Sequence, residues 1–86
     1  MSLEELRGQI DETDAQLLEL FLRRMSVSEA IGGYKKEHGL PVLDEAREAE
    51  KLNRLCKLVG DGDKAAVRAL FEELMRLSRA RQEGIL

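Results

Sequence analysis

The chain has 86 residues, enough for one domain spanning residues 1–86, whose single core gives only marginal stability unless the protein oligomerises. A net charge of −3, with one tyrosine, two phenylalanines and no tryptophan, argues against a nucleic-acid-binding surface. No run of about eighteen apolar residues and no signal-peptide pattern occur, so we expect no membrane span. The single cysteine, Cys56, excludes an intramolecular disulfide and suits a reducing compartment, so we expect a cytoplasmic protein.

The first and longest predicted element is an uninterrupted helix from Ser2 to Glu37. Ser2 and Glu5 have the pattern of a capping box, and apolar residues then recur at helical spacing with no proline between them. At about 1.5 Å per residue this helix would be roughly 50 Å long, whereas a compact chain of this size has a radius of gyration of about 12 Å. One chain therefore cannot cover this helix by itself.

Three cations on the long helix indicate an anion-binding site. Lys35 follows Arg24 by eleven residues, which brings both to within about 20° of one helix face and separates them by roughly 16 Å along the axis. Two long basic side chains across this gap leave room for a small dianion. Arg7 lies about 25 Å from Arg24 and about 100° around the axis, so it can serve the same ligand only from another subunit.

Glycines mark the end of the first helix. Gly32 and Gly33 each cost about 1 kcal/mol relative to alanine, which indicates either the close approach of a neighbouring helix or room for a ligand beside the backbone. Gly39 suits a left-handed C-terminal cap, and Pro41 prevents the helix from continuing. His38 is interpreted as a loop or C-cap cation rather than a catalytic base.

Two shorter helices are predicted after this loop. Asp44 is the expected N-cap of a helix that ends near Val59, and Asp63 is the expected N-cap of a helix that runs close to the C-terminus. Their predicted buried stripes are Leu52, Leu55, Cys56 and Val59 in the first, and Val67, Leu70, Phe71, Leu74 and Leu77 in the second. No segment has the pattern of a strand, so the chain is predicted to be all-α, with one long and two shorter helices.

Polar residues stand out at two places in the predicted shorter helices. Asp44, Arg47 and Glu48 bring two acceptors and a cation together at a helix start, although acidic residues favour helix N-termini without any function. Ser78 and Gln82 continue the last apolar stripe where a purely structural helix would have leucine. Buried polar groups need partners, but solvation at a frayed helix end explains this pair equally well.

The sequence contains no Ser-His-Asp candidate, no phosphate-binding glycine loop, no cluster of metal-ligating residues and no second histidine. We therefore expect neither a cofactor nor a metal. The remaining polar groups suit a dicarboxylate with a hydroxyl group, and they are Arg7, Arg24, Lys35, Asp44, Glu48, Ser78 and Gln82. Such a set also suits a reaction that needs only shape and fixed charge.

Five segments in order resemble the all-helical chorismate mutases of the AroQ class. They are Leu6-Arg7-x-x-Ile10-Asp11-x-x-Asp14-x-x-Leu17-Leu18, Arg23-Arg24-Met25, Ile31-Gly32-x-Tyr34-Lys35, Pro41-Val42-x-Asp44-x-x-Arg47-Glu48 and Ser78-x-x-x-Gln82. Each segment alone is weakly specific, but together they cover essentially the whole chain. Only the loop between the second and third helices is shorter than the family pattern.

The resemblance implies an intertwined homodimeric helical bundle whose long helices cross the molecular dyad, with two equivalent active sites. It also implies the reaction, which is the intramolecular Claisen rearrangement of chorismate to prephenate on the route to phenylalanine and tyrosine. The expected partners are therefore the substrate chorismate and a second copy of the chain, with no nucleic acid and no membrane.

Carried over residue by residue, the resemblance implies that Arg24 and the partner subunit's Arg7 hold the two substrate carboxylates. Lys35 and Gln82 would point at the ether oxygen, so that Lys35, Gln82 and Arg24 form the catalytic set.

The remaining site positions bind the rest of the substrate in the same family pattern. Glu48 and the backbone at Asp44 would accept a hydrogen bond from the ring hydroxyl. Ser78 would help to seat a carboxylate, and Arg47 would organise the two acidic residues and add positive field.

Two other functions fit the same residues. Isochorismate-pyruvate lyase activity uses the same scaffold and also acts on a dicarboxylate enol ether by positioning it. A non-catalytic helical interaction module fits the charged surface, which makes up 36% of the residues, but such a helix would more naturally offer an exposed apolar stripe.

Overall fold

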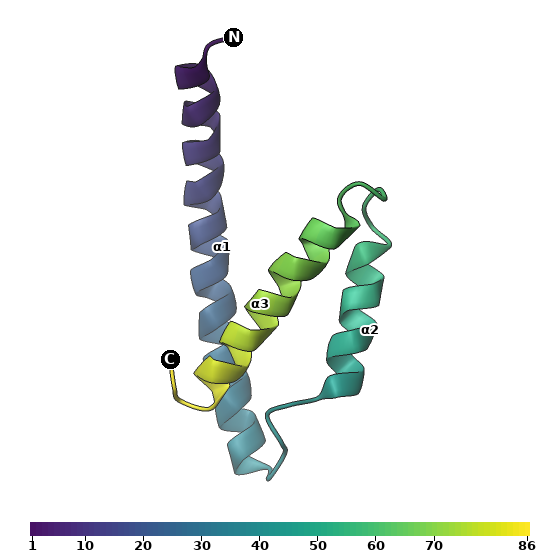
Figure 1. The fold of residues 1–86 in the computed structure, drawn as a ribbon. Helices are drawn as coiled ribbons and strands as arrows, with labels where there is room; N and C mark the ends of the chain where they lie inside the picture. The colour runs from purple at the N-terminus through teal and green to yellow at the C-terminus, as the bar shows by residue number, and fades with distance from the viewer.

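The computed structural model describes all 86 residues and contains three helices and no strand. Helix α1 spans Leu3–Glu37, α2 spans Glu45–Cys56 and α3 spans Lys64–Gln82. Helix α3 lies in the middle, with the C-terminal half of α1 on one side and α2 on the other (Figure 1). The all-α prediction with one long and two shorter helices is confirmed. No helix is long and apolar enough to cross a membrane.

Both ends of α1 are capped at the predicted residues, although the Glu5 carboxylate does not accept from the backbone N–H of Ser2, so the capping box is only half formed. The Ser2 side-chain oxygen accepts a hydrogen bond from the backbone N–H of Glu5 at 3.1 Å. At the other end Gly39 adopts a φ of +65°, and the N–H of Leu40 donates to the carbonyl of Lys35 at 2.8 Å, which is the pattern of a Schellman cap. The helix continues through Gly32 and Gly33, so its predicted length is confirmed.

The caps of the shorter helices differ from each other. The Asp44 carboxylate accepts a hydrogen bond from the backbone N–H of Arg47 at 3.1 Å, which confirms Asp44 as the N-cap of α2. Asp63 stands at the N-cap position of α3, but its side chain makes no capping hydrogen bond. Its backbone has helical dihedral angles, which Ncap residues usually lack, so the prediction of a side-chain cap there is wrong.

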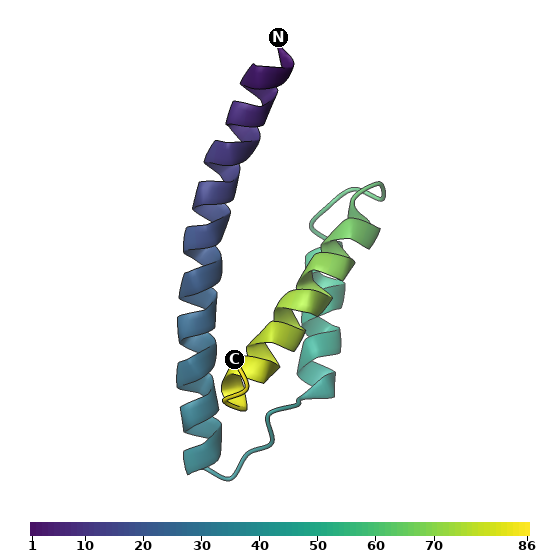
Figure 2. The ribbon, with the colours of Figure 1, turned by 60° about the vertical axis from the view of Figure 1, so that its left-hand side comes forward.

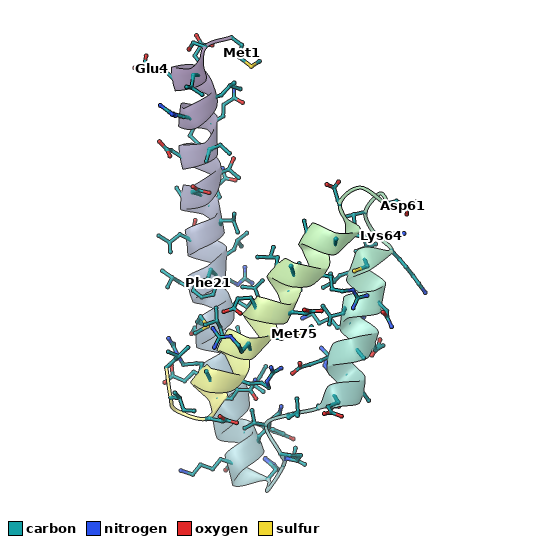
Figure 3. The ribbon with its side chains drawn as sticks, in the orientation of Figure 1. Met1, Glu4, Phe21, Asp61, Lys64 and Met75 are labelled. Carbon is teal, nitrogen blue, oxygen red and sulfur yellow. The ribbon has the colours of Figure 1, made fainter.

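Helix α2 is also shorter than predicted, because it ends at Cys56 rather than near Val59. The backbone N–H of Leu58 donates to the carbonyl of Leu55, a three-residue spacing that tightens the last turn before the chain reverses. Val59, the last residue of the predicted stripe, lies in this turn and is half-buried, whereas its neighbour Leu58 is 76% exposed. The reversal lies beside Asp61 and Lys64, which form a surface ion pair (Figure 3).

The core of the single chain is small and lies where α3 meets its two neighbours. Only five residues of 86 are buried, and they are Met25, Ser28, Gly32, Cys56 and Met75. The burial of Cys56 confirms its place in the predicted buried stripe of the second helix. Leu70, which was predicted to be in the core, is 48% exposed, whereas Met75 was not predicted and is 5% exposed. The crossing point of two helices decides which residues are buried, and helical spacing alone does not locate it.

The N-terminal half of α1 has no neighbour in the chain. It rises beyond α2 and α3 in two different views, and its end around Met1 and Glu4 lies far from both (Figures 2 and 3). The molecule is 54 Å long with a radius of gyration of 15.9 Å, well above the compact value of about 12 Å. Several apolar side chains on this half are exposed, among them Leu3, Leu6, Ile10, Leu17 and Leu18. The expectation that one chain cannot cover this helix is confirmed.

One glycine allows α1 and α3 to come close together. A Cβ atom added to Gly32 would lie 2.7 Å from the Cα atom of Gln82 and 2.8 Å from its carbonyl oxygen. A Cβ atom added to Gly33 would meet nothing within 4 Å in the chain. The predicted close approach of a helix is therefore confirmed for Gly32 and is not found for Gly33.

We predict that Gly32→Ala destabilises the protein by about 1–3 kcal/mol, because backbone atoms of α3 would have to move away from the new methyl group. Gly33→Ala is the matched control, and it should leave stability unchanged or raise it by up to about 1 kcal/mol through helix propensity. Urea denaturation followed by circular dichroism measures both effects. Equal stability of the two variants would show that the close contact at Gly32 does not exist.

Candidate active site

A cavity of about 270 Å³ lies where α1 and α2 face each other without packing together. Both helices pack on α3, which forms the third side, and Val42 and Asp44 line the cavity from the segment between α1 and α2. Its size is close to the lower end of the range for small-molecule sites, about 300–1,000 Å³. Most of its 14 lining residues are polar or charged, and only Val27, Ile31, Val42 and Met75 are hydrophobic.

Most of the residues predicted for a functional site line this one cavity. They are Arg24 and Lys35 from α1, Asp44 from the loop, Arg47 and Glu48 from α2, and Ser78 and Gln82 from α3. The prediction that Arg24 and Lys35 share a helix face is therefore confirmed. Arg7 is the exception, because it lies on the exposed N-terminal half of α1 and does not line the cavity.

Backbone carbonyl groups hold two of the cavity cations. The Arg24 guanidinium donates to the carbonyl of Leu74 at 3.1 Å, and the Lys35 ammonium donates to the carbonyl of Val42 at 2.7 Å. Burial lowers the pKa of Arg24 from its ordinary value, because a partly desolvated guanidinium loses hydration of its charge. A carbonyl is a neutral group that fixes a cation without cancelling its net charge, so both side chains can still attract an anion.

The acidic residues of the site are arranged differently from the predicted cluster. The carboxylate of Asp44 caps the backbone of α2, and that of Glu48 forms an ion pair with Arg79 of α3. We expected the Arg47 side chain to bridge these two carboxylates, but it forms an ion pair with neither. The physical reason is tertiary, because α3 brings a second guanidinium to Glu48 across the α2–α3 interface. This pair is partly shielded, with side-chain exposures of 29% for Arg79 and 25% for Glu48.

Two cations of the cavity were missed in the sequence. Lys51 lies one turn after Arg47 on α2, and Arg79 follows Ser78 on α3. The position of Lys51 was available from helical spacing, because residues four apart share a face. The cavity thus holds five cations, counting Arg24, Lys35 and Arg47, against two carboxylates. The excess of three positive charges makes the site strongly attractive to an anion.

Ser28 was also missed, and it organises the polar end of α3. Its hydroxyl lies 2.9 Å from the carbonyl of Arg24 and 2.6 Å from the hydroxyl of Ser78. Because the single hydroxyl hydrogen of Ser28 is donated to the carbonyl, Ser78 must be the donor to Ser28. Ser78 then accepts the hydrogen bond from the Gln82 amide nitrogen at 3.2 Å, while the Gln82 amide oxygen is buried without a partner. This order fixes the orientation of the Gln82 amide.

The single histidine and the single cysteine both lie outside the cavity. His38 is the C-cap of α1, and its ring nitrogen contacts the carbonyl of Tyr34 at 2.9 Å while the two rings stack. This confirms the interpretation of His38 as a cap. Cys56 is buried at the α2–α3 end of the molecule, with its sulfur 3.9 Å from the carbonyl of Lys64.

An all-helical chain with a cavity rich in cations that lack carboxylate partners is typical of a binding protein or enzyme for a small anion. Residues 6–83 match the family described as Chorismate mutase type II. The chain belongs to this family of isomerase-type enzymes.

Individual relatives agree with this assignment. The chain is 37% identical over 79 residues to the intracellular chorismate mutase of Mycobacterium bovis, covering 92% of this chain and 70% of that protein. It is 35% identical over 78 residues to the T-protein of Haemophilus influenzae, but it spans only 19% of that protein's length. A solved structure, a conserved hypothetical protein from Pyrococcus furiosus, superposes with a TM-score of 0.77 at 35% identity over 93% of each chain.

We predict that Ser28→Ala costs about 1–3 kcal/mol of stability, because it leaves the donor of Ser78 without its buried acceptor. Ser26→Ala is the matched control on an exposed face of the same helix and should change stability by only a few tenths of a kcal/mol. Urea denaturation gives both values, and the side-chain amide signals of Gln82 in nitrogen-edited NMR spectra should shift only in Ser28→Ala. Unchanged amide signals in that variant would refute the proposed order of hydrogen bonds.

Proposed function

We propose that the protein is a homodimeric chorismate mutase that converts chorismate to prephenate by an intramolecular Claisen rearrangement, in the biosynthesis of phenylalanine and tyrosine. The observation that carries this proposal is the excess of cations in the cavity of a chain from this family. Chorismate carries two carboxylates, so its charge complements the site. A cytoplasmic location agrees with the intracellular relative.

A second copy of the chain supplies what one copy lacks. The uncovered apolar residues on the N-terminal half of α1 need a partner surface, since exposed apolar patches of this extent usually mark an interface. Arg7 lies on the same half of the helix and too far along it to enter its own cavity. In an intertwined dimer, Arg7 of each chain enters the cavity of the other, which makes two equivalent active sites.

Two arginines hold the ends of the substrate. Arg24 and the partner subunit's Arg7 bind the two carboxylates through charge-assisted, fork-shaped hydrogen bonds. The carbonyl of Leu74 already fixes one nitrogen of Arg24, which reduces the entropy that binding would otherwise cost. Ser78 helps to seat a carboxylate.

The ring side of the substrate contacts α2 and the loop before it. Glu48 and the backbone at Asp44 accept a hydrogen bond from the ring hydroxyl. The ion pair with Arg79 holds the Glu48 carboxylate in place, and Arg47 adds positive field.

The reaction itself needs no nucleophile and no proton transfer. It is pericyclic, so the protein accelerates it by holding the compact chair-like conformer and by stabilising negative charge that develops on the ether oxygen as its bond to carbon breaks. Lys35 and Gln82 supply the donors for this oxygen. The carbonyl of Val42 holds the Lys35 ammonium at 2.7 Å, and Ser78 orients the Gln82 amide, so both donors are positioned before the substrate arrives.

We predict that the protein forms prephenate from chorismate and that Lys35→Ala lowers kcat by about 100-fold to 1,000-fold, the usual cost of losing a preorganised donor. Lys36→Ala is the matched control, because Lys36 is exposed and lies outside the cavity. Product analysis with chorismate and with isochorismate also separates the two activities of this scaffold. Pyruvate from isochorismate without prephenate from chorismate would refute the proposal, and full activity of Lys35→Ala would refute the role of Lys35.

A further inference from the structure

One cation of the cavity has no assigned role and no anionic partner. Lys51 lines the cavity from α2, and neither its ammonium nor the guanidinium of Arg24 lies within ion-pair distance of any carboxylate. The Lys51 ammonium also makes no hydrogen bond within the chain, whereas Arg24 and Lys35 are each fixed by a carbonyl. Lys51 is therefore free to bind a ligand that enters the cavity.

We propose that Lys51 is a further substrate-binding residue and that it shares one carboxylate of the substrate with Arg24. The two side chains come from α2 and α1, which meet only across the cavity, so a carboxylate between them would connect the two walls. This inference rests on the proposed function, because it assigns one more contact to the same substrate.

The electrostatic surroundings of Lys51 support this role. Burial lowers its pKa, and the positive charges of Arg24, Arg47 and Arg54 lower the pKa further. Among the other charged groups that line the cavity, Lys35 and Arg79 are cations, and the carboxylates of Asp44 and Glu48 are engaged by the α2 backbone and by Arg79 respectively. The free protein thus holds Lys51 among like charges without compensation.

A carboxylate placed between Lys51 and Arg24 would remove this repulsion. The attraction acts only when a ligand is present, so it contributes to affinity rather than to folding. Loss of the Lys51 charge should therefore weaken substrate binding while relieving repulsion in the free protein. A residue with a merely structural role would change stability in the opposite direction.

The test compares Lys51→Met with Lys51→Arg, and uses Lys57→Met as the matched control on an exposed position beyond the end of α2. We expect Lys51→Met to raise KM for chorismate about tenfold or more, the typical effect of losing a charge-assisted contact, with a smaller change in kcat. Its thermal midpoint without substrate should be equal to or above that of the wild type. Lys57→Met should change neither quantity.

The pH dependence gives a second readout with a defined sign. A lowered pKa means that Lys51 loses its proton at a lower pH than an ordinary lysine, so the wild-type KM should rise as the pH increases through that pKa. Lys51→Arg keeps its charge and should shift this rise to higher pH. Lys51→Met should show a high KM with no such rise.

The possible outcomes separate this inference from the proposed function. If the wild type forms prephenate, the proposed function stands. The role of Lys51 is then refuted by an unchanged KM in Lys51→Met, or by a raised KM together with a lowered thermal midpoint. If the wild type does not turn chorismate over, calorimetric titration with chorismate replaces KM by Kd, and the same comparison of variants decides. A wild type that neither converts nor binds chorismate overturns both proposals.

Discussion

The length of α1 is the constraint on which the rest of the structure depends. Its 35 residues exceed what α3, with 19 residues, can cover, and α2 does not pack against it, so the N-terminal half of the helix is left without a neighbour. The covered half is held by one close crossing, where Gly32 lets the backbone of α3 approach at Gln82. This crossing places Gln82 and Ser78 beside Arg24 and Lys35, and the same helix leaves Arg7 far from them. In the proposed dimer, a second chain would supply the Arg7 that the cavity of one chain lacks.

Repulsion among the cations of the cavity opposes folding, and the same positive charges favour the binding of an anion. Five cations surround a small cavity, and only Arg79 has a carboxylate as a partner. The backbone carbonyls of Leu74 and Val42 hold Arg24 and Lys35 in place without neutralising them. In the proposed mechanism, the remaining attraction acts on a dianionic ligand and on negative charge that develops during its reaction. Fixed charge of this kind would need no rearrangement at the moment of reaction, so a simple helical scaffold would suffice.

Local patterns in the sequence predicted what depends on one helix alone. The caps at Ser2, Gly39 and Asp44 and the shared face of Arg24 and Lys35 follow from spacing within one element, and all are confirmed. Contacts between helices were not predictable in the same way. The pairing of Glu48 with Arg79 depends on how α2 packs on α3.

Residues of the core and the site were missed for the same reason, because their roles depend on contacts between helices. Burial of Met75 in place of Leu70 depends on where α3 crosses α1, and neighbouring residues on a helix are equally good candidates until that point is known. The role of Ser28 required knowledge that Ser78 lies opposite it. Lys51 is different, because its helical spacing from Arg47 was visible and only its significance was overlooked.

Subunit exchange between Arg7→Ala and Arg24→Ala tests most directly whether two chains share each site. Each variant alone should be nearly inactive, because every site in it lacks one arginine. A mixed dimer has one site with both arginines and one with neither, so an equal mixture at full exchange should recover about a quarter of wild-type activity. No recovery, with mixed dimers verified by native mass spectrometry, would show that Arg7 does not act across the interface.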